Sequence, residues 1–189
     1  KAMNIPEGTI TSYKRGASEF SAQIAKMKAD NCDLVVLGTV IRETIGAAAE
    51  AKKNGWNVDF LASSAANVQE VAALGKEAVE GIYAAGWFEI PYADTAKGKV
   101  KDWLEAYKKA FNVDGNSSAI IGYNNIYTFA HYAKLAGKDL TGQKFLDALE
   151  SGDVFKSIFD TPPTKFSKTS HIGSIETAVQ QIKNGRWIV

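Results

Sequence analysis

The chain of 189 residues carries 22 basic and 21 acidic residues, so its formal net charge is +1. A balance this close to neutral provides no long-range field that would gather nucleic acid, and we expect no nucleic-acid partner. Apolar residues make up 46% of the chain and charged residues 23%, as in a folded globular protein rather than a disordered one. The longest uninterrupted apolar runs are too short to span a bilayer. The single cysteine, Cys32, excludes an intrachain disulfide and a cysteine-based metal cluster.

Apolar runs and helical patterns alternate along the first half of the chain. The pattern predicts strands at residues 9–13, 34–38, 58–62 and 81–88, and helices from Ser18 to about residue 30, at 42–54 and at 68–74. Ser18 is the expected N-cap of the first helix, and Gly55 supplies the left-handed residue that ends the second. The continuous apolar run at 34–38 is typical of a parallel strand buried on both faces. Strand–helix–strand order with short links predicts an α/β protein with a doubly wound parallel sheet.

The second half of the chain loses this alternation. Three helices are predicted in succession, at 95–111, at 117–136 and at 141–150 with Thr141 as the cap of the last. Residues 174–182 predict a strand, and the Asn184-Gly185 turn brings residues 186–189 back along it. The three helices have apolar faces but no sheet of their own. We therefore expect a segment that precedes Lys1 to supply that sheet, so that this chain starts in the middle of a fold.

The sequence lacks the common catalytic motifs. It contains no Gly-x-Gly-x-x-Gly, no Gly-x-x-x-x-Gly-Lys phosphate loop and no Gly-x-Ser-x-Gly elbow. Of the two histidines, we expect His131 to be a packed or surface imidazole inside a tyrosine-rich helix, and His171 to be solvated in a polar loop. Neither belongs to a cluster of ligands at metal-binding spacing. We therefore expect no enzymatic activity, no metal and no cofactor.

Loops that follow the predicted parallel strands are the places to expect a ligand, because ligands of open α/β sheets bind beyond the carboxyl ends of the strands. Residues 39–42 and 63–67 are small or hydroxyl-rich, and both loops precede helices, so their backbone N–H groups and hydroxyls suit a small polar ligand. Helix capping is the alternative role for Thr39 and Ser64. Arg42 can anchor a carboxylate, with an ordinary surface charge as the alternative. The exit of the last parallel strand, at 87–89, is the third such loop.

An ordered set of short motifs resembles the branched-chain amino-acid (Leu/Ile/Val) binding-protein family. The set consists of TSYKRGASEFSAQI at 11–24, KMKA at 26–29, DLVVLG at 33–38, FLASS at 60–64, AVEGIY at 78–83, the stretch 119–123 with its helix, and the Asn184-Gly185 ending. No one motif is diagnostic, but their order is, and the resemblance covers nearly the whole chain. Members of this family are type I periplasmic binding proteins, the solute receptors of ABC importers.

The resemblance implies a type I periplasmic-binding-protein fold with two lobes, of which the N-terminal half is missing from this chain. Residues 1–88 would then be an α/β segment of the second lobe, 89–175 a helical return into the first lobe, and 176–189 the C-terminal hairpin strands of the second lobe. The implied partners are a small-molecule ligand, the membrane subunits of an ABC transporter, and the missing N-terminal half. The implied location is the periplasm, or the extracytoplasmic face as a lipoprotein. We expect the chain not to fold well without its other half.

The family also implies a ligand site, from which this sequence departs. Amino-acid binders of the family place an aromatic residue at the position of Val40 and an acidic residue near Ser64, where it neutralises the α-ammonium of the ligand. A buried ammonium without a carboxylate is costly, so we expect a carboxylate with an apolar, for instance aromatic, body rather than an α-amino acid. Tyr123, Trp87 and Phe88 can stack on a ring, with core packing as their alternative role. The candidate ligand-binding residues are Thr39, Val40, Arg42, Ser63, Ser64, Ala65, Trp87 and Tyr123.

Three other functions remain open at this point. One is a ligand-sensing domain of a regulator or receptor with the same fold, which the sequence before Lys1 would distinguish from a transport receptor. Another is a genuine branched-chain amino-acid binder. The third is an α/β enzyme of flavodoxin-like form, which the absence of a paired base and nucleophile disfavours.

Overall fold

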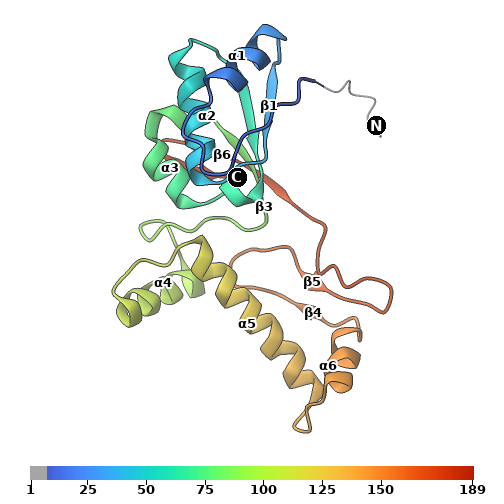
Figure 1. Cartoon of the computed structure of the whole chain (residues 1–189). Coiled ribbons are helices and arrows are strands. Elements are labelled where there is room, and N and C mark those ends of the chain that lie inside the picture. Colours follow the sequence, from blue (N-terminus) through green and yellow to red (C-terminus); the bar gives the residue numbers. More distant parts are fainter. Residues whose placement is uncertain (1–7) are drawn as a thin grey trace. The chain divides into compact units, whose positions relative to one another are not determined.

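The computed structural model describes residues 8–189, which divide into two compact units (Figure 1). Among the described residues, unit 1 comprises residues 8–86 and Val179–Val189, and unit 2 comprises Trp87–Ala178. The assignment of residues 1–88, 89–175 and 176–189 to lobes of a larger protein stays a prediction. Within residues 8–189, no helix is both long enough and apolar enough to cross a membrane.

A five-stranded mixed sheet forms the centre of unit 1. Its strands are β1 (Leu34–Leu37), β2 (Asp59–Ala62), β3 (Tyr83–Gly86), β6 (Ala178–Lys183) and β7 (Arg186–Ile188), in the order β1-β2-β3-β6-β7. The pairs β1–β2 and β2–β3 are parallel, as predicted, and β6 pairs antiparallel with β7. Asn184 and Gly185 both have positive φ, at 53° and 71°, which gives the turn the backbone twist that a two-residue hairpin needs.

Unit 1 has three α-helices, of which the first precedes β1 and the other two connect the parallel strands. They are α1 (Ser21–Ala29), α2 (Ile41–Lys53) and α3 (Gln69–Gly75), with 3-10 turns at Ser64–Ala66 and Lys76–Val79. Gly55 has a φ of +58° directly after the C-cap of α2, which confirms the predicted end of that helix. The predicted cap of the first helix is wrong, because α1 begins after Phe20 and no side chain caps it. Phe20 is buried, and its ring lies so close to Gly46 of α2 that a Cβ there would meet it at 2.8 Å, so packing fixes the start of α1.

The strand predicted at 9–13 is wrong. Residues 8–13 have no strand structure, and no described strand pairs with the outer edge of β1. Side chains hold this segment instead: Gln23 donates a hydrogen bond to the carbonyl of Ser12 (2.9 Å), and the Tyr13 hydroxyl donates one to the carbonyl of Gly38 (3.0 Å). An alternating pattern makes a strand only where backbone hydrogen bonds join it to a neighbouring strand, and residues 8–13 are part of no described sheet.

The prediction that β1 is buried on both faces is also wrong for the described chain. Val35 and Leu37 are 4% and 6% exposed, whereas Leu34 and Val36 are 49% and 72% exposed. The register pairs Val35 with Phe60 and Leu37 with Ala62, all of them buried. The residues between them therefore belong to a sheet face that no described element covers at β1.

Unit 2 consists of three helices and one short antiparallel ladder. The helices α4 (Gly98–Phe111), α5 (Ser117–Ala136) and α6 (Gly142–Leu149) confirm the three that were predicted, although α4 begins three residues later. Thr141 caps α6 as predicted, because its side-chain oxygen accepts from the N–H of Lys144. Strands β4 (Val154–Phe155) and β5 (Thr164–Lys165), which pair antiparallel beside these helices, were not predicted.

Candidate functional site

The two hydroxyl-rich loops lie together at the carboxyl edge of the sheet in unit 1. Strands β1 and β2 end in register, with Leu37 opposite Ala62, so the loops that follow them leave from the same place. The N–H of Ser63 donates to the carbonyl of Leu37 (3.1 Å), which joins the base of the second loop to the end of β1. The structure therefore brings six of the eight candidate residues together, namely Thr39, Val40, Arg42, Ser63, Ser64 and Ala65.

Thr39 has an internal partner at this edge. It is 5% exposed, and its Oγ1 lies 2.6 Å from Oγ1 of Thr44, which is fully buried in α2. Capping by Thr39 is excluded, since Val40 is the N-cap of α2 and makes no side-chain cap bond. The hydroxyl of Thr39 thus orients the start of α2, and a direct contact with a ligand stays a prediction.

The surface of the first loop is formed by Val40 and Arg42, which are both exposed at the start of α2. The next residue, Glu43, is only 3% exposed. One of its carboxylate oxygens accepts a hydrogen bond from the N–H of Gly16 (3.1 Å), and the other, Oε2, is buried without a hydrogen-bond partner among the described residues. Glu43 holds the segment around Gly16 against α2. Sequence reasoning missed it because an acidic residue in a first helical turn looks like an ordinary surface charge.

The second loop presents an exposed hydroxyl. Ser63 precedes the 3-10 turn Ser64–Ala66 and makes no side-chain cap bond, and Ser64 and Ala65 are both exposed. Backbone bonds alone hold the turn, from the N–H of Ala66 to the carbonyl of Ser63 and from the N–H of Asn67 to the carbonyl of Ser64. The capping role that was the alternative for Ser64 is therefore wrong. A small ligand at this edge would meet the Ser64 hydroxyl.

Two buried amide side chains border the end of β3. Asn67 is 5% exposed and Gln180 is 1% exposed, and Nδ2 of Asn67 donates to Oε1 of Gln180 at 3.4 Å. A Cβ on Gly86 would lie 2.5 Å from Nε2 of Gln180 and 2.7 Å from Oδ1 of Asn67, so only glycine fits between the strand and this pair. Sequence reasoning did not single out Gln180, because it comes 113 residues after Asn67.

Trp87 and Tyr123 belong to unit 2 and pack within it. The Trp87 ring meets Phe88 edge-on at 5.0 Å. The Tyr123 ring stacks on Tyr127 at 3.9 Å, with an interplanar angle of 19°, and meets Trp103 and Phe159 edge-on at 5.8 and 5.3 Å. Burial, and next the hydrogen bond with Tyr127, raise the pKa of Tyr123 to about 12. These ring contacts agree with the alternative role of Trp87 and Tyr123, which is packing within the protein. Stacking on a ligand stays a prediction for both residues.

A pocket of about 530 Å³ opens at the other end of the sheet in unit 1. Residues 56–60 and 80–82, at the starts of β2 and β3, line much of it, together with Lys52 and Gln181. None of the predicted ligand-binding residues lines this pocket. In the described part of the chain, no group of three or more His, Cys, Asp or Glu residues is placed to hold a metal ion.

Comparisons with known proteins agree with this architecture. A family model described as periplasmic binding protein matches residues 7–186. A leucine-binding protein of Thermotoga maritima has a TM-score of 0.73 and 20% identity, over 93% of this chain and 49% of that one. A branched-chain amino-acid ABC transporter protein of Thermus thermophilus with bound valine has a TM-score of 0.79 and 17% identity, over 92% and 48%. An ABC-transporter solute-binding protein of R. palustris in complex with benzoate has a TM-score of 0.71 and 15% identity, over 93% and 47%.

The search of curated proteins by sequence finds no match. The chain spans about half the length of the solved structures it matches. At these identities the structures show a shared fold, which is the α/β fold of the type I periplasmic binding proteins. Because the family model matches all but a few terminal residues, this chain belongs to the periplasmic binding protein family.

Proposed function

We propose that this chain is part of an extracytoplasmic receptor of an ABC importer, which binds a small solute between two hinge-closing lobes and catalyses no reaction. The observation that carries the proposal is the pair of adjoining loops at the carboxyl edge of the sheet, in a member of a solute-receptor family. The proposed location is the periplasm or, for a lipoprotein, the extracytoplasmic face of the membrane. The transporter's membrane subunits would receive the closed, loaded form.

The proposed ligand is a carboxylate with an apolar, for instance aromatic, body. Exposed Arg42 offers a cation at this edge, and the Ser64 hydroxyl lies on the adjoining loop. The resemblance implies that amino-acid binders of the family have an aromatic residue in the loop of Val40 and an acidic residue near Ser64, and this chain departs from both. Glu43 does not replace that acid at the surface, because it is buried and bonded to Gly16. The R. palustris protein with benzoate shows that this fold accepts an aromatic carboxylate.

A branched-chain amino-acid receptor is the second candidate. The Thermus thermophilus protein with bound valine, with a TM-score of 0.79, favours it. In this case the α-ammonium of the ligand needs a carboxylate. Glu43, with one buried oxygen that has no hydrogen-bond partner in residues 8–189, is the acidic side chain nearest in sequence to the first loop. The segment around Gly16 would then have to move to admit the ligand.

We propose that the N-terminal half of a longer protein packs against this chain and completes its fold. In unit 1, Leu34, Val36 and Val179 are 49%, 72% and 56% exposed. In unit 2, Ile126 and Phe129 of α5 are 66% and 54% exposed. Large apolar side chains in this number mark surfaces that another element covers. The solved structures that this chain matches are about twice as long as the chain. A segment of that extra length is large enough to cover the exposed apolar residues.

A thermal-shift screen on the whole protein tests the proposed ligand class, because a ligand that binds the folded state raises the melting temperature. The panel holds benzoate and other aromatic carboxylates, short-chain acids, their amides, leucine and valine. We expect aromatic or other carboxylates to raise the melting temperature, and leucine, valine and the amides to leave it unchanged. A shift with leucine or valine alone would overturn the ligand class and favour the second candidate. A whole protein that responds to no member of the panel would contradict both.

A further inference from the structure

The second loop of the proposed ligand site, residues 63–67, is held at both ends by other elements of unit 1. At its start, the N–H of Ser63 donates to the carbonyl of Leu37 at the end of β1 (3.1 Å). At its end, Nδ2 of Asn67 donates to Oε1 of Gln180 on β6 at 3.4 Å. Between these two points the loop is exposed, and its 3-10 turn has no side-chain cap. The position of the exposed residues therefore depends on how firmly the two ends are held.

A second hydrogen bond fixes the residue that follows the loop. The indole N–H of Trp187, on β7, donates to the carbonyl of Val68 at 2.9 Å. Trp187 and Gln180 are each 1% exposed, so both hold the loop from inside the core of unit 1. They come 119 and 113 residues after the residues that they bind. The end of the loop is thus held by the hairpin of β6 and β7, which is distant in sequence.

The strand between the loop and the hairpin leaves room for the amide pair. Gly86, the last residue of β3, has no Cβ, and both amide side chains reach into the space that a Cβ would fill. Asn67 is 5% exposed, so water has little access to the pair. A buried amide that loses its partner pays the cost of desolvation without a hydrogen bond in return. The pair is therefore expected to resist separation, and with it the displacement of the loop.

We propose that Gln180 and Trp187 are positioning residues of the ligand site, which hold the end of the loop 63–67 so that its exposed residues meet the ligand. This inference rests on the proposed function, because it takes the loop as part of the ligand site. Neither side chain touches the ligand: Gln180 acts through Asn67, and Trp187 acts through Val68. Removal of either hydrogen bond frees the loop to adopt other positions. Ligand affinity then falls, because only part of the protein is in the conformation that binds.

Amide hydrogen exchange on the whole protein, without ligand, measures the hold on the loop. The variants Gln180→Met and Trp187→Phe each remove one of the two hydrogen bonds and keep a large buried side chain. We expect the amides of residues 66–68 to exchange about two- to tenfold faster in each variant than in wild type. This factor is taken relative to the amides of β1 and β2, which report the stability of unit 1 as a whole.

Ile182→Val is the matched control in the same strand. Ile182 is 0% exposed and lies two residues after Gln180 on the same buried face of β6, but its apolar side chain makes no hydrogen bond to the loop. Its truncation should speed exchange at residues 66–68 and in β1 and β2 by the same factor. A merely structural role for Gln180 and Trp187 predicts this uniform pattern for their variants as well.

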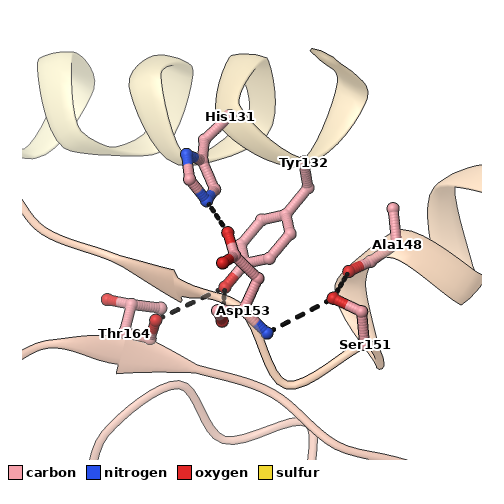
Figure 2. Close-up of polar contacts among 6 residues, drawn as sticks. All are labelled: His131, Tyr132, Ala148, Ser151, Asp153 and Thr164. Carbon is pink, nitrogen blue, oxygen red and sulfur yellow. Dashed lines mark hydrogen bonds and ion pairs between the residues drawn. The ribbon is translucent and has the colours of Figure 1, made fainter. Parts of the chain in front are cut away.

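Tyr132→Phe is a second control, in unit 2. Figure 2 shows the two hydrogen bonds that it removes, from the Tyr132 hydroxyl to the carbonyls of Asp153 (3.0 Å) and Thr164 (3.3 Å). Exchange at residues 66–68 should be the same in this variant as in wild type. For Gln180→Met or Trp187→Phe, exchange at residues 66–68 that rises no more than in β1 and β2 would overturn the proposal for the residue replaced.

Ligand affinity separates this inference from the proposed function. Calorimetric titration uses the carboxylate that gives the largest thermal shift with wild type. Gln180→Met and Trp187→Phe should bind it about two- to tenfold more weakly, and Ile182→Val should bind it as wild type does. Faster exchange at residues 66–68 with unchanged affinity would overturn the positioning role. A wild-type protein that binds no carboxylate would contradict the proposed ligand class, and the exchange comparison would still decide whether the two hydrogen bonds hold the loop.

Discussion

The two units of the chain hold their structures together in different ways. In unit 1, ladders between strands distant in sequence fix the positions of loops, so that the residues after β1 and β2 meet at one edge because Leu37 stands opposite Ala62. In unit 2, the ladder that β4 forms with β5 has two residues per strand. The helices of unit 2 are joined instead through rings such as Trp103, Tyr123 and Phe159, and through the polar contacts of Tyr132.

The difference shows what each unit is suited to do. The hydrogen-bond register of a parallel sheet holds the loops at its carboxyl edge in defined positions. A binding site for a small solute requires loops held in this way. Helices joined by side chains depend on the packing and hydrogen bonds of those side chains rather than on a strand register. The exposed apolar residues differ as well: in unit 1 they include Leu34 and Val36 on one face of β1, and in unit 2 they include residues along α5.

The largest expected effect comes from producing the 189 residues without any other part of a longer protein. Both units leave apolar residues exposed, such as Val36 at 72% and Ile126 at 66%, so we expect no cooperative thermal transition for the isolated chain. Calorimetry on the isolated chain and on the whole protein makes the comparison. A sharp transition for the isolated chain, equal to that of the whole protein, would show that the chain needs no further segment.

The next largest effect is expected for Trp187→Ala, which acts on unit 1. Trp187 is 1% exposed, and its indole N–H donates to the carbonyl of Val68 (2.9 Å). Truncation of a buried aromatic residue of this size costs about 3–5 kcal/mol in the free energy of unfolding. Urea unfolding of the whole protein measures the loss, with Ile175→Ala, a residue 90% exposed, as the control that should change little. Equal losses for the two variants would mean that Trp187 is not part of the core of unit 1.

A smaller effect is expected at the Thr39–Thr44 pair, which supports the first loop. Replacing either threonine by valine leaves the other hydroxyl buried without its partner, at a cost of about 1–3 kcal/mol in unfolding free energy. The double variant removes both hydroxyls and should lose less than the sum of the single losses. Urea unfolding of the four proteins measures this coupling. Strict additivity would show that the two hydroxyls do not interact.

The smallest effect is expected from Tyr123 at alkaline pH, and it acts on unit 2. A tyrosine in the unfolded chain ionises near pH 10, whereas in the fold the pKa of Tyr123 is about 12. Its contribution to stability is therefore complete below about pH 10 and declines as the pH rises toward about 12, because the unfolded state releases its proton first. Tyr123→Phe should flatten the pH dependence of unfolding over this range. If the free energy of unfolding of wild type and variant depended on pH with the same slope, the Tyr123 hydroxyl would be exposed to water and its pKa would not be raised by the fold.

The sequence predicted elements whose signals are local. Helix α5 has its predicted bounds, and local signals mark both ends, because Asn116 caps its start and Gly137 follows its end with a φ of +88°. The hairpin at Asn184-Gly185 and the cap at Thr141 are of the same kind. The strand predicted at 9–13 failed because strand formation depends on pairing with a neighbour, and residues 9–13 join no described sheet.

The candidate site was predictable in position but not in detail. Strand order alone placed the loops at 39–42 and 63–65 at one edge, since all parallel strands end there. What the sequence did not show were buried polar contacts between distant residues, such as Glu43 with Gly16 and Asn67 with Gln180. Such residues read as surface residues in sequence because only tertiary packing buries them.

Hydrogen exchange of the whole protein, with and without the carboxylate that gives the largest thermal shift, tests most directly whether the carboxyl edge of unit 1 is the ligand site. Binding should slow exchange at residues 39–42 and 63–65, the loops that follow β1 and β2, and leave the opposite end of the sheet, around Trp56 and Gly81, unchanged. Protection at that opposite end, with none at the two loops, would contradict the proposed site.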